Sequence, residues 1–293
     1  MRSKRFLTVL LGLLSLLAGV GVWIYWPTPD LGIPMPKDLG TLDQRLAQQI
    51  QMGIENVQFE PELPKSWGEL GMVYHANGMP DLGIECYARA IELQANNPRW
   101  WYFSAMAEKE LAHLPRSLEL LDRVVELKND FAPAHWRRGL IFFDRGDLEN
   151  AERAFRKAIE VDSRDGAGWR GLARVLLQLD RPGEVVVLMR QWLGTGVHDP
   201  YAHRLLGLAY RQTGETELAE AEIRESGDEK PVWQDLWMYE VVQYGSNVGV
   251  LMKEARHCIE HHQFRRAIDI LEPLSERQAT DISVLNTLAQ AYI

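Results

Sequence analysis

The chain has 293 residues, of which 46% are hydrophobic and 25% are charged, and this composition excludes a largely disordered protein. Its formal net charge of −9 excludes general binding to the phosphates of nucleic acids. The two cysteines, Cys86 and Cys258, have no paired spacing, which excludes a disulfide framework and a zinc ribbon.

The first predicted element is a transmembrane helix, which makes residues 1–26 a membrane anchor. Phe6–Trp26 is a long run that contains no charged residue. A helix of this length crosses a hydrocarbon layer of about 30 Å, because each residue adds about 1.5 Å. Trp23, Tyr25 and Trp26 are typical of the membrane interface. A cleaved signal peptide is the alternative, although Ala18–Val20 is a poor cleavage site.

Basic residues predict the orientation of this helix. Arg2, Lys4 and Arg5 precede the apolar run. Positively charged flanks stay in the cytoplasm, so the amino terminus is expected there and the body on the far side. The sequence therefore predicts a single-pass membrane protein with an extracytoplasmic body, which is periplasmic if the protein is bacterial.

A proline-rich tether and a leading helix are expected next. Residues 27–41 include PTPDLGIPMP, whose four prolines favour an extended chain. Residues 42–63 are predicted to contain a leading helix, which Pro61 and Pro64 end. Its apolar residues follow one another at intervals of four, four, four and three, which places them on one helical face: Leu42, Leu46, Ile50, Ile54 and Val57.

Residues 64–230 contain five units that start at equal intervals along the chain. Each unit has a small residue that lets its first helix, helix A, approach its second, helix B. Three units have a glycine that accepts the left-handed conformation and ends helix A. Each unit is therefore predicted to be a pair of antiparallel helices. The units start at Pro64, Pro98, Ala132, Gly166 and Pro200, the small residues are Gly71, Ala105, Gly139, Ala173 and Gly207, and the turn glycines are Gly78, Gly146 and Gly214.

This regular period and residue order resemble the tetratricopeptide repeat (TPR), from about residue 64 to the end of the chain. The resemblance implies an all-α fold in which helix pairs stack into an α-solenoid, a right-handed superhelix. The match is poorest in the second and fourth units, where Ser104 with Ala105, and Ala173, replace the usual large residue and glycine. The family's proline near the end of each unit is matched only by Pro231.

After the fifth unit the chain departs from the regular repeat interval. Residues 231–247 form an aromatic insert with Trp233, Trp237, Tyr239 and Tyr244. Two interpretations stay open, a longer helix pair that packs these rings and a site-specific loop. Residues 248–293 are predicted to hold a sixth unit and an interrupted seventh, and the interruption leaves open that the native chain is longer.

The sequence has no catalytic pattern. It lacks a glycine-rich phosphate loop, a nucleophile elbow and a His-Glu-x-x-His motif, so we expect neither an enzyme nor a cofactor. The cluster of His257, Cys258, His261 and His262 has helical spacing that suits a metal. Cys258 falls at a packed position of the repeat, however, so a polar turn with a buried thiol is the preferred interpretation and no metal site is predicted.

The resemblance implies that the inner wall of the solenoid is a peptide-binding groove lined by helix A. Arginine binds carboxylates with two parallel hydrogen bonds, and aromatic pockets hold bulky side chains. The expected partner is a protein or peptide with acidic and bulky apolar residues. Composition alone explains some of the arginines on this wall, because the chain contains more arginine than lysine throughout. The candidate peptide-binding residues are Tyr102, Phe103, Met106, Trp136, Arg137, Leu140, Phe143, Arg170, Arg174, Arg204, Arg211 and Arg256.

The functional hypothesis is a membrane-tethered, non-catalytic TPR scaffold that binds its partner through this groove. Gly68 and Met72 do not match the lysine and asparagine positions of TPR proteins that bind chaperone tails. One alternative is an accessory factor in envelope assembly, such as cytochrome c maturation, secretion or polysaccharide export. Another is the amino-terminal scaffold of a longer enzyme.

Overall fold

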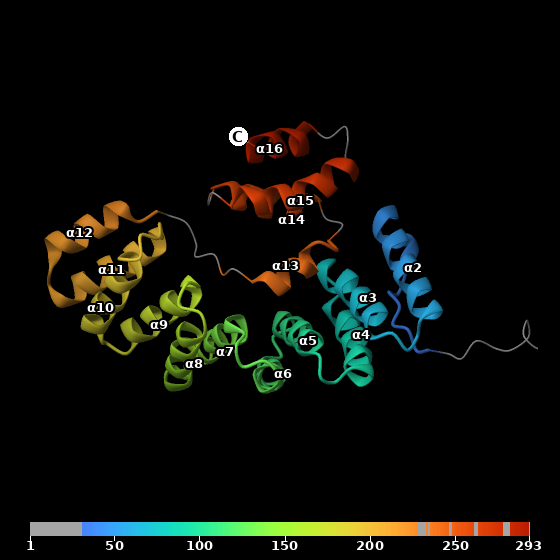
Figure 1. The fold of residues 1–293 in the computed structure, drawn as a ribbon, viewed down its shortest axis with the longest axis horizontal. Coiled ribbons are helices and arrows are strands. Elements are labelled where there is room, and N and C mark those ends of the chain that lie inside the picture. Colours follow the sequence, from blue (N-terminus) through green and yellow to red (C-terminus); the bar gives the residue numbers. More distant parts are fainter. Residues whose placement is uncertain are drawn as a thin grey trace, which may run out of the picture. The chain divides into compact units, whose positions relative to one another are not determined.

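The computed structural model describes residues 31–227, 233, 235–245, 248–260, 263–277 and 282–292. The chain divides into residues 1–33 and residues 34–293, and the helices of the described residues lie in the second unit. All regular structure in the described residues is helical, with one short 3-10 helix, η1 (Leu39–Thr41), and the helices α2 to α16 (Figure 1). The prediction of an all-α protein is confirmed.

The leading helix is α2 (Gln44–Phe59). The side chain of Asp43 begins it by accepting hydrogen bonds from the backbone N–H groups of Arg45 and Leu46. Its buried residues belong to the predicted apolar face and are Leu46, Ile50, Ile54 and Val57. Ahead of it, the carbonyl oxygen of Pro34 accepts a hydrogen bond of 2.7 Å from the hydroxyl of Tyr74, so the predicted tether contacts the first repeat.

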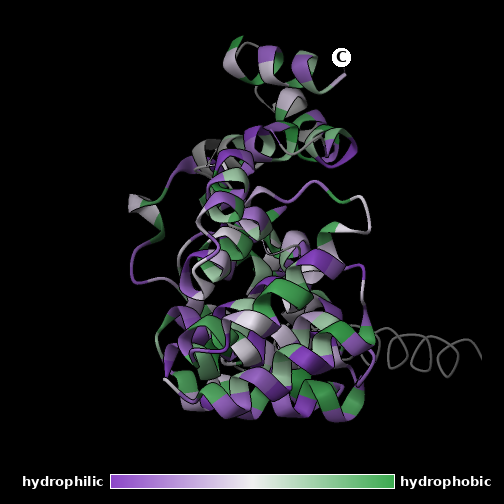
Figure 2. Cartoon of the chain, turned by 90° about the vertical axis from the view of Figure 1, so that its left-hand side faces the viewer, coloured by the Kyte–Doolittle hydropathy of each residue, from purple (hydrophilic) through white to green (hydrophobic). Residues whose placement is uncertain are grey.

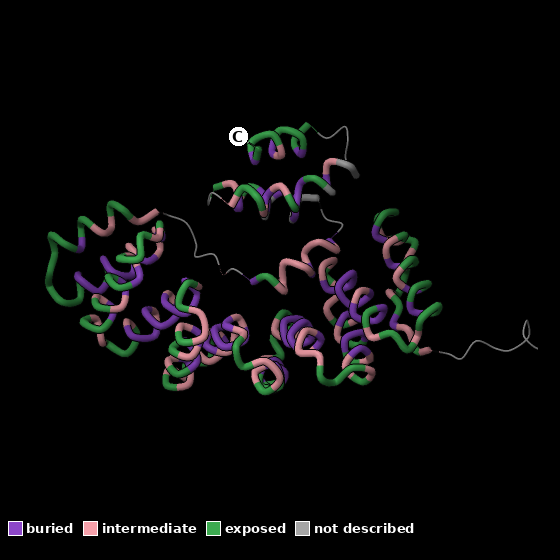
Figure 3. The backbone as a smooth tube through the Cα atoms, viewed as in Figure 1, coloured by how far each residue is buried: buried purple, intermediate pink, exposed green. Residues whose placement is uncertain are grey.

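Five helical hairpins follow, and their first helices begin at equal intervals along the chain. Neighbouring helices pack against one another in chain order (Figure 1). The first helices carry more buried residues than their partners (Figure 3). The hairpins are α3 (Pro64–Ala76) with α4 (Pro80–Leu93), α5 (Pro98–Glu110) with α6 (Leu114–Leu127), α7 (Ala132–Asp144) with α8 (Leu148–Val161), α9 (Gly166–Gln178) with α10 (Pro182–Leu193), and α11 (Pro200–Thr213) with α12 (Thr216–Glu225).

The ring of Phe155 joins the third hairpin to the fourth. It is 1% exposed and lies between Gly139 of its own hairpin and Gly171 of the next. A Cβ atom added at Gly139 would lie 2.8 Å from this ring, and one added at Gly171 would lie 2.1 Å from it. Glycine is therefore required at both positions by close packing.

Replacing Gly171 with alanine is expected to lower the free energy of unfolding by about 1–3 kcal/mol, because the buried ring of Phe155 cannot move aside. Gly183 provides the matched control, since it is an exposed helical glycine with no atom near an added Cβ. Gly183→Ala should change stability by less than about 0.5 kcal/mol. Urea denaturation of both variants measures the difference, and equal midpoints would contradict this packing.

The turn between helices requires a left-handed residue in all five hairpins. Gly78, Gly146 and Gly214 have φ angles of +76°, +75° and +84°, as the sequence predicts. The equivalent residues of the second and fourth hairpins are not glycines, yet Ala112 and Asp180 have φ angles of 61° and 55°. These two residues carry backbone strain that the other three hairpins avoid.

Relieving this strain should stabilise the protein. Ala112→Gly is expected to raise the free energy of unfolding by about 1 kcal/mol, because glycine adopts the left-handed conformation without a Cβ clash. The reverse change at the equivalent turn, Gly146→Ala, should lower it by a similar amount. Thermal denaturation of both variants measures the two shifts, and shifts of the same sign would rule out strain as the cause.

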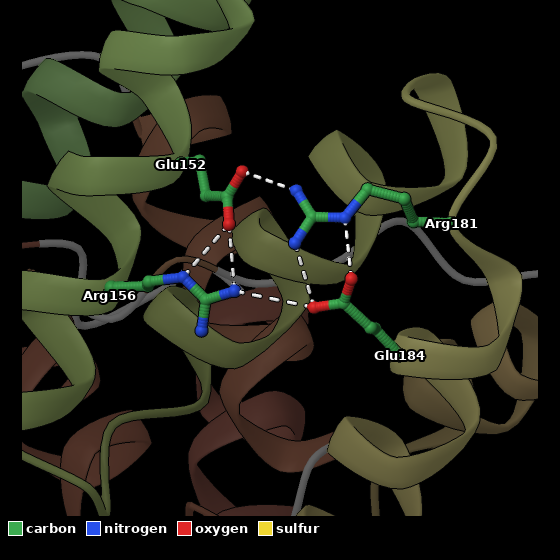
Figure 4. A network of polar contacts seen from close by, with 4 residues as sticks. All are labelled: Glu152, Arg156, Arg181 and Glu184. Atoms are coloured by element: carbon green, nitrogen blue, oxygen red, sulfur yellow. Dashed lines mark hydrogen bonds and ion pairs between the residues drawn. The ribbon is translucent and has the colours of Figure 1, made fainter.

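A charged network on the surface links α8 to the residues that open α10 (Figure 4). Glu152 accepts hydrogen bonds from Arg156 at 2.7 and 2.9 Å and from Arg181 at 2.7 Å. Arg181 also donates to both carboxylate oxygens of Glu184, at 2.6 and 2.8 Å. Burial alone would raise the pKa of Glu152, but the two arginines outweigh it and hold that pKa below its ordinary value.

A carboxyl group whose pKa is lowered by folding stabilises the protein above its unfolded pKa, and this contribution is lost as the pH falls through the folded value. Glu152→Gln should therefore lower stability at pH 7 by up to about 1 kcal/mol, with a difference from the wild type that shrinks in acid. The control is Glu149→Gln, because Glu149 is exposed and makes one long contact to Arg153. Urea midpoints measured from pH 7 downwards give the result, and a difference independent of pH would refute the ionic account.

The carboxyl-terminal helices have a core of their own. They are α14 (Val248–Glu260), α15 (Phe264–Arg277) and α16 (Ile282–Tyr292). Buried residues from all three helices form one cluster, which includes Cys258. The thiol of Cys258 is therefore packed, in line with the preferred interpretation of the His257 to His262 stretch.

The membrane prediction requires correction. In the described part of the chain no helix has the length and apolar character needed to cross a membrane, and hydrophilic and hydrophobic residues alternate along its helices (Figure 2). The predicted anchor, Phe6–Trp26, lies outside the described residues. We therefore withdraw the prediction of a single-pass membrane protein, and with it the extracytoplasmic placement of the body.

Candidate functional site

A short helix that follows the fifth hairpin returns to the first helices of the array. This helix, α13 (Leu236–Val242), contacts α3 and α5 (Figure 1). We call Trp233 together with residues 235–245 the inserted segment. Six of the repeat residues that contact it form what we call the inner face, which consists of Arg99, Tyr102, Phe131, Trp136, Arg137 and Arg170.

Asp235 is the polar centre of this contact. It is 4% exposed, and its Oδ1 caps α13 by accepting from the backbone N–H of Met238 at 3.1 Å. Its Oδ2 accepts two hydrogen bonds from Arg137, at 2.7 and 3.0 Å, and one from the hydroxyl of Tyr102. Burial and then the charge of Asp235 raise the pKa of Tyr102 well above its ordinary value. The phenol therefore keeps its proton and acts as a donor to the carboxylate.

Aromatic rings also join the inserted segment to the repeats. Trp237 stacks on Phe131 with ring centroids 3.9 Å apart, and it meets the ring of Tyr102 edge-on at 5.4 Å. Trp233 lies 5.7 Å from Trp136, and the guanidinium of Arg170 lies 5.7 Å from the ring of Trp233. Both tryptophans of the insert thus pack against the repeats, which favours the packing interpretation of the insert over an exposed loop.

The carboxyl-terminal end of the inserted segment makes further polar contacts. Glu240 forms an ion pair with Arg99, and both side chains are more than a third exposed. Asn77 donates to the carbonyl oxygen of Tyr244 at 3.0 Å. Burial and the neighbouring Glu69 raise the pKa of Tyr244 to about 12. The segment is therefore held by the first three hairpins and by Arg170 of the fourth.

The predicted binding residues fall into two groups. Tyr102, Trp136, Arg137 and Arg170 meet the inserted segment, and Arg204 donates to the carbonyl oxygen of Gly227 just ahead of it. The others lie elsewhere. Phe103 and Met106 are buried, Leu140 and Phe143 pack against the core, Arg174 lies over the ring of Phe143, Arg211 is exposed, and Arg256 donates to Ser283.

Arg170 also has a second, structural contact. Its guanidinium donates to Asp199 at 2.9 Å, and that residue is 4% exposed. Asp199 accepts from Trp192 Nε1 at 2.9 Å and caps α11 through the backbone N–H of Ala202 at 3.0 Å. Arg170 therefore fixes the start of the fifth hairpin.

Sequence reasoning did not identify Arg99, Asp235 and Glu240 as site residues. Two features of the sequence could have identified Asp235. It precedes a helix of apolar residues, where a capping carboxylate is favoured, and it lies in an aromatic-rich stretch outside the repeat register. Arg99 and Glu240 carry no local signal, because they are 141 residues apart in the chain.

The metal alternative finds no support in the described residues. Within these ranges no group of three or more His, Cys, Asp or Glu side chains is arranged to hold a metal ion. Cys258 is 1% exposed and packs in the core of α14 to α16. His261 and His262 of the predicted cluster lie outside the described residues.

Comparisons with known proteins agree on the repeat. Family models described as tetratricopeptide repeat match residues 64–97, 104–160 and 136–184. The chain is 30% identical over 109 residues to FK506-binding protein-like of Mus musculus, which covers 34% of this chain and 31% of that protein. It is 27% identical over 96 residues to a TPR repeat-containing protein of Methanocaldococcus jannaschii, which covers 33% of this chain and 17% of that one. The chain thus spans less than a third of these two relatives.

A solved structure shares the fold. The crystal structure of MamA protein aligns with a TM-score of 0.52 and 18% sequence identity, covering 56% of this chain and 90% of that chain. At this identity the likeness concerns the arrangement of helices alone.

Proposed function

The chain contains tetratricopeptide repeats, and from this premise we propose that it is a non-catalytic scaffold that binds a protein or peptide partner through the inner face. Arrays of stacked helical hairpins offer an extended surface rather than a closed pocket, and such surfaces serve protein recognition. The partner is expected to carry acidic and bulky apolar residues.

One observation carries this proposal. A peptide segment with this chemistry already lies on the inner face, where Arg137 and Tyr102 hold the carboxylate of Asp235 and Phe131 stacks on Trp237. Hydrogen bonds from a guanidinium to a carboxylate are charge-assisted and stronger than those between neutral groups. The surface is therefore competent to bind an acidic, aromatic peptide.

The predicted binding arginines of α9 and α11 provide the test. Arg170 is unsuitable for it, because its contact with Asp199 is structural. Arg174 lies over the ring of Phe143 and Arg204 donates to the carbonyl oxygen of Gly227, and we expect that charge reversal at both weakens peptide binding by at least about tenfold without loss of helicity. The control reverses two exposed arginines of the third hairpin, Arg145 and Arg153.

The probes are peptides selected from a random display library on the full chain and, in parallel, on the variant Trp237→Ala. We expect the selected peptides to be enriched in acidic and aromatic residues. Titration of these peptides against the two double variants, with circular dichroism as the measure of helicity, gives the result. Failure of both baits to select peptides, or equal affinities for the Arg174/Arg204 and Arg145/Arg153 variants, would overturn the proposed function.

A further inference from the structure

The inserted segment presents three recognition groups at fixed spacing. They are the carboxylate of Asp235, the indole of Trp237 and the carboxylate of Glu240, so an acidic residue is followed two positions later by a large ring and five positions later by a second acidic residue. Because Asp235 caps the helix that carries the other two, one short helix displays all three side chains.

Each of these groups meets a complementary group on the inner face. Arg137 and Tyr102 donate three hydrogen bonds to Asp235, the ring of Phe131 stacks on Trp237, and Arg99 pairs with Glu240. The charges are opposite at both ends and the centre is aromatic on both sides. The segment is therefore bound as a peptide ligand would be, and the two carboxylates fix the position of the helix along the face.

Beyond the contacts of Asp235 and Trp237, the helix of the segment is held weakly. A helix as short as α13 is marginal in isolation, and Val241 is the buried residue of this helix. The ion pair of Glu240 with Arg99 is exposed on both sides and contributes little. A partner that presents the same groups on a longer helix has more surface to bury.

Unfilled space exists beside α13. An open cavity of about 720 Å³ lies between α13, the start of α2 and the first two hairpins. Met238, Val241 and Val242 line it from α13, and His75, Asn77 and Glu110 line it from the repeats. The inserted segment therefore leaves part of its surroundings unfilled, and a larger ligand gains contacts that the segment does not make.

We infer that the inserted segment is an internal ligand of the inner face, and that the partner is a helical peptide segment with the same acidic–aromatic–acidic spacing, which binds by displacing it. This inference rests on the proposed function and adds the partner's pattern and the competition. The apparent affinity for the partner is then reduced by the fraction of molecules in which the segment occupies the face.

The test uses a labelled synthetic peptide with the sequence of residues 231–245, titrated against the full chain by fluorescence polarisation. Trp237→Ala in the chain removes the ring that holds the segment and should tighten peptide binding by at least about tenfold. Leu236→Ala is the matched control, because Leu236 is next to Trp237 and is 73% exposed. This variant should bind the peptide with the same affinity as the wild type. Peptides with asparagine for Asp235 or alanine for Trp237 should bind at least about tenfold more weakly.

A second variant keeps the test valid if Trp237→Ala loses helicity. Glu240→Lys places a positive charge beside Arg99 at the exposed edge and leaves Asp235 and Trp237 in place. It should also tighten peptide binding, by a smaller factor. Equal affinity of the wild type and both variants for the peptide would overturn the inference.

The remaining outcomes separate this inference from the function on which it rests. If library-selected peptides bind through Arg174 and Arg204 while the 231–245 peptide binds no variant, the function stands and the inference fails. If no peptide binds, both fail. Light scattering gives one more outcome. If the wild type is a dimer and Trp237→Ala is a monomer, the segment on the inner face belongs to a second copy of the chain, and this result would overturn the internal arrangement.

Discussion

Asp199→Ala is expected to lower the free energy of unfolding by about 3–5 kcal/mol. The substitution removes the carboxylate that pairs with Arg170 at 2.9 Å, in a position where the two side chains are 13% and 5% exposed. It also removes the acceptor of the Trp192 indole N–H and the cap of α11. The loss should be concentrated in the last two hairpins, because each repeat contacts only its neighbours.

Asp199→Asn separates the helix cap from the other two contributions. The one amide oxygen of asparagine can take the place of Oδ1 and cap α11, but the NH2 group in the place of Oδ2 cannot accept from Trp192 or Arg170. This variant should therefore keep only the contribution of the cap and lose slightly less than the alanine variant. Urea denaturation followed by circular dichroism gives both values. An alanine variant within about 1 kcal/mol of the wild type would contradict the structural role of the Arg170–Asp199 pair.

Phe155→Ala is expected to cost a similar amount, about 3–5 kcal/mol, because it removes the ring that fills the space between the third and fourth hairpins. The glycines at positions 139 and 171 have no side chains that fill the resulting cavity. The same ring makes Gly171→Ala destabilising, so the two substitutions are expected to be coupled.

A double-mutant cycle measures that coupling. In the Phe155→Ala background an alanine at position 171 has room for its methyl group, so Gly171→Ala should cost less than in the wild type, or even stabilise the helix. Equal effects of Gly171→Ala in both backgrounds would show that the ring does not fill this joint.

Much of the fold follows from local patterns in the sequence. The first helices of the five hairpins begin at Pro64, Pro98, Ala132, Gly166 and Pro200, where the register predicts them. A regular period specifies each hairpin from residues that are close in the chain, and neighbour-to-neighbour stacking then needs no long-range information. The same logic explains why the left-handed turns recur even at Ala112 and Asp180, where the local residue type disfavours them.

The site was harder to predict, because it depends on a contact that breaks the period. Tyr102 and Asp235 are 133 residues apart, and no regular spacing connects them. The resemblance placed Tyr102, Trp136 and Arg137 on a binding surface but gave no sign that the chain's own insert lies there. It also could not separate Arg170, which supports α11 through Asp199, from an arginine reserved for a ligand. The alternatives of an envelope assembly factor and of a longer enzyme stay predictions.

Site-specific crosslinking tests the central claim, that the inserted segment lies on the inner face until a partner displaces it. Cysteines in place of Arg99 and Glu240 report on an exposed contact and leave Asp235 and Trp237 intact, while the native Cys86 and Cys258 are buried. A pair at Arg99 and the exposed Glu220 of α12 is the control. A short thiol crosslinker should join positions 99 and 240 within one molecule, and saturating amounts of the selected peptide should abolish this product. Absence of the 99–240 product, or its persistence at saturating peptide, would contradict the account.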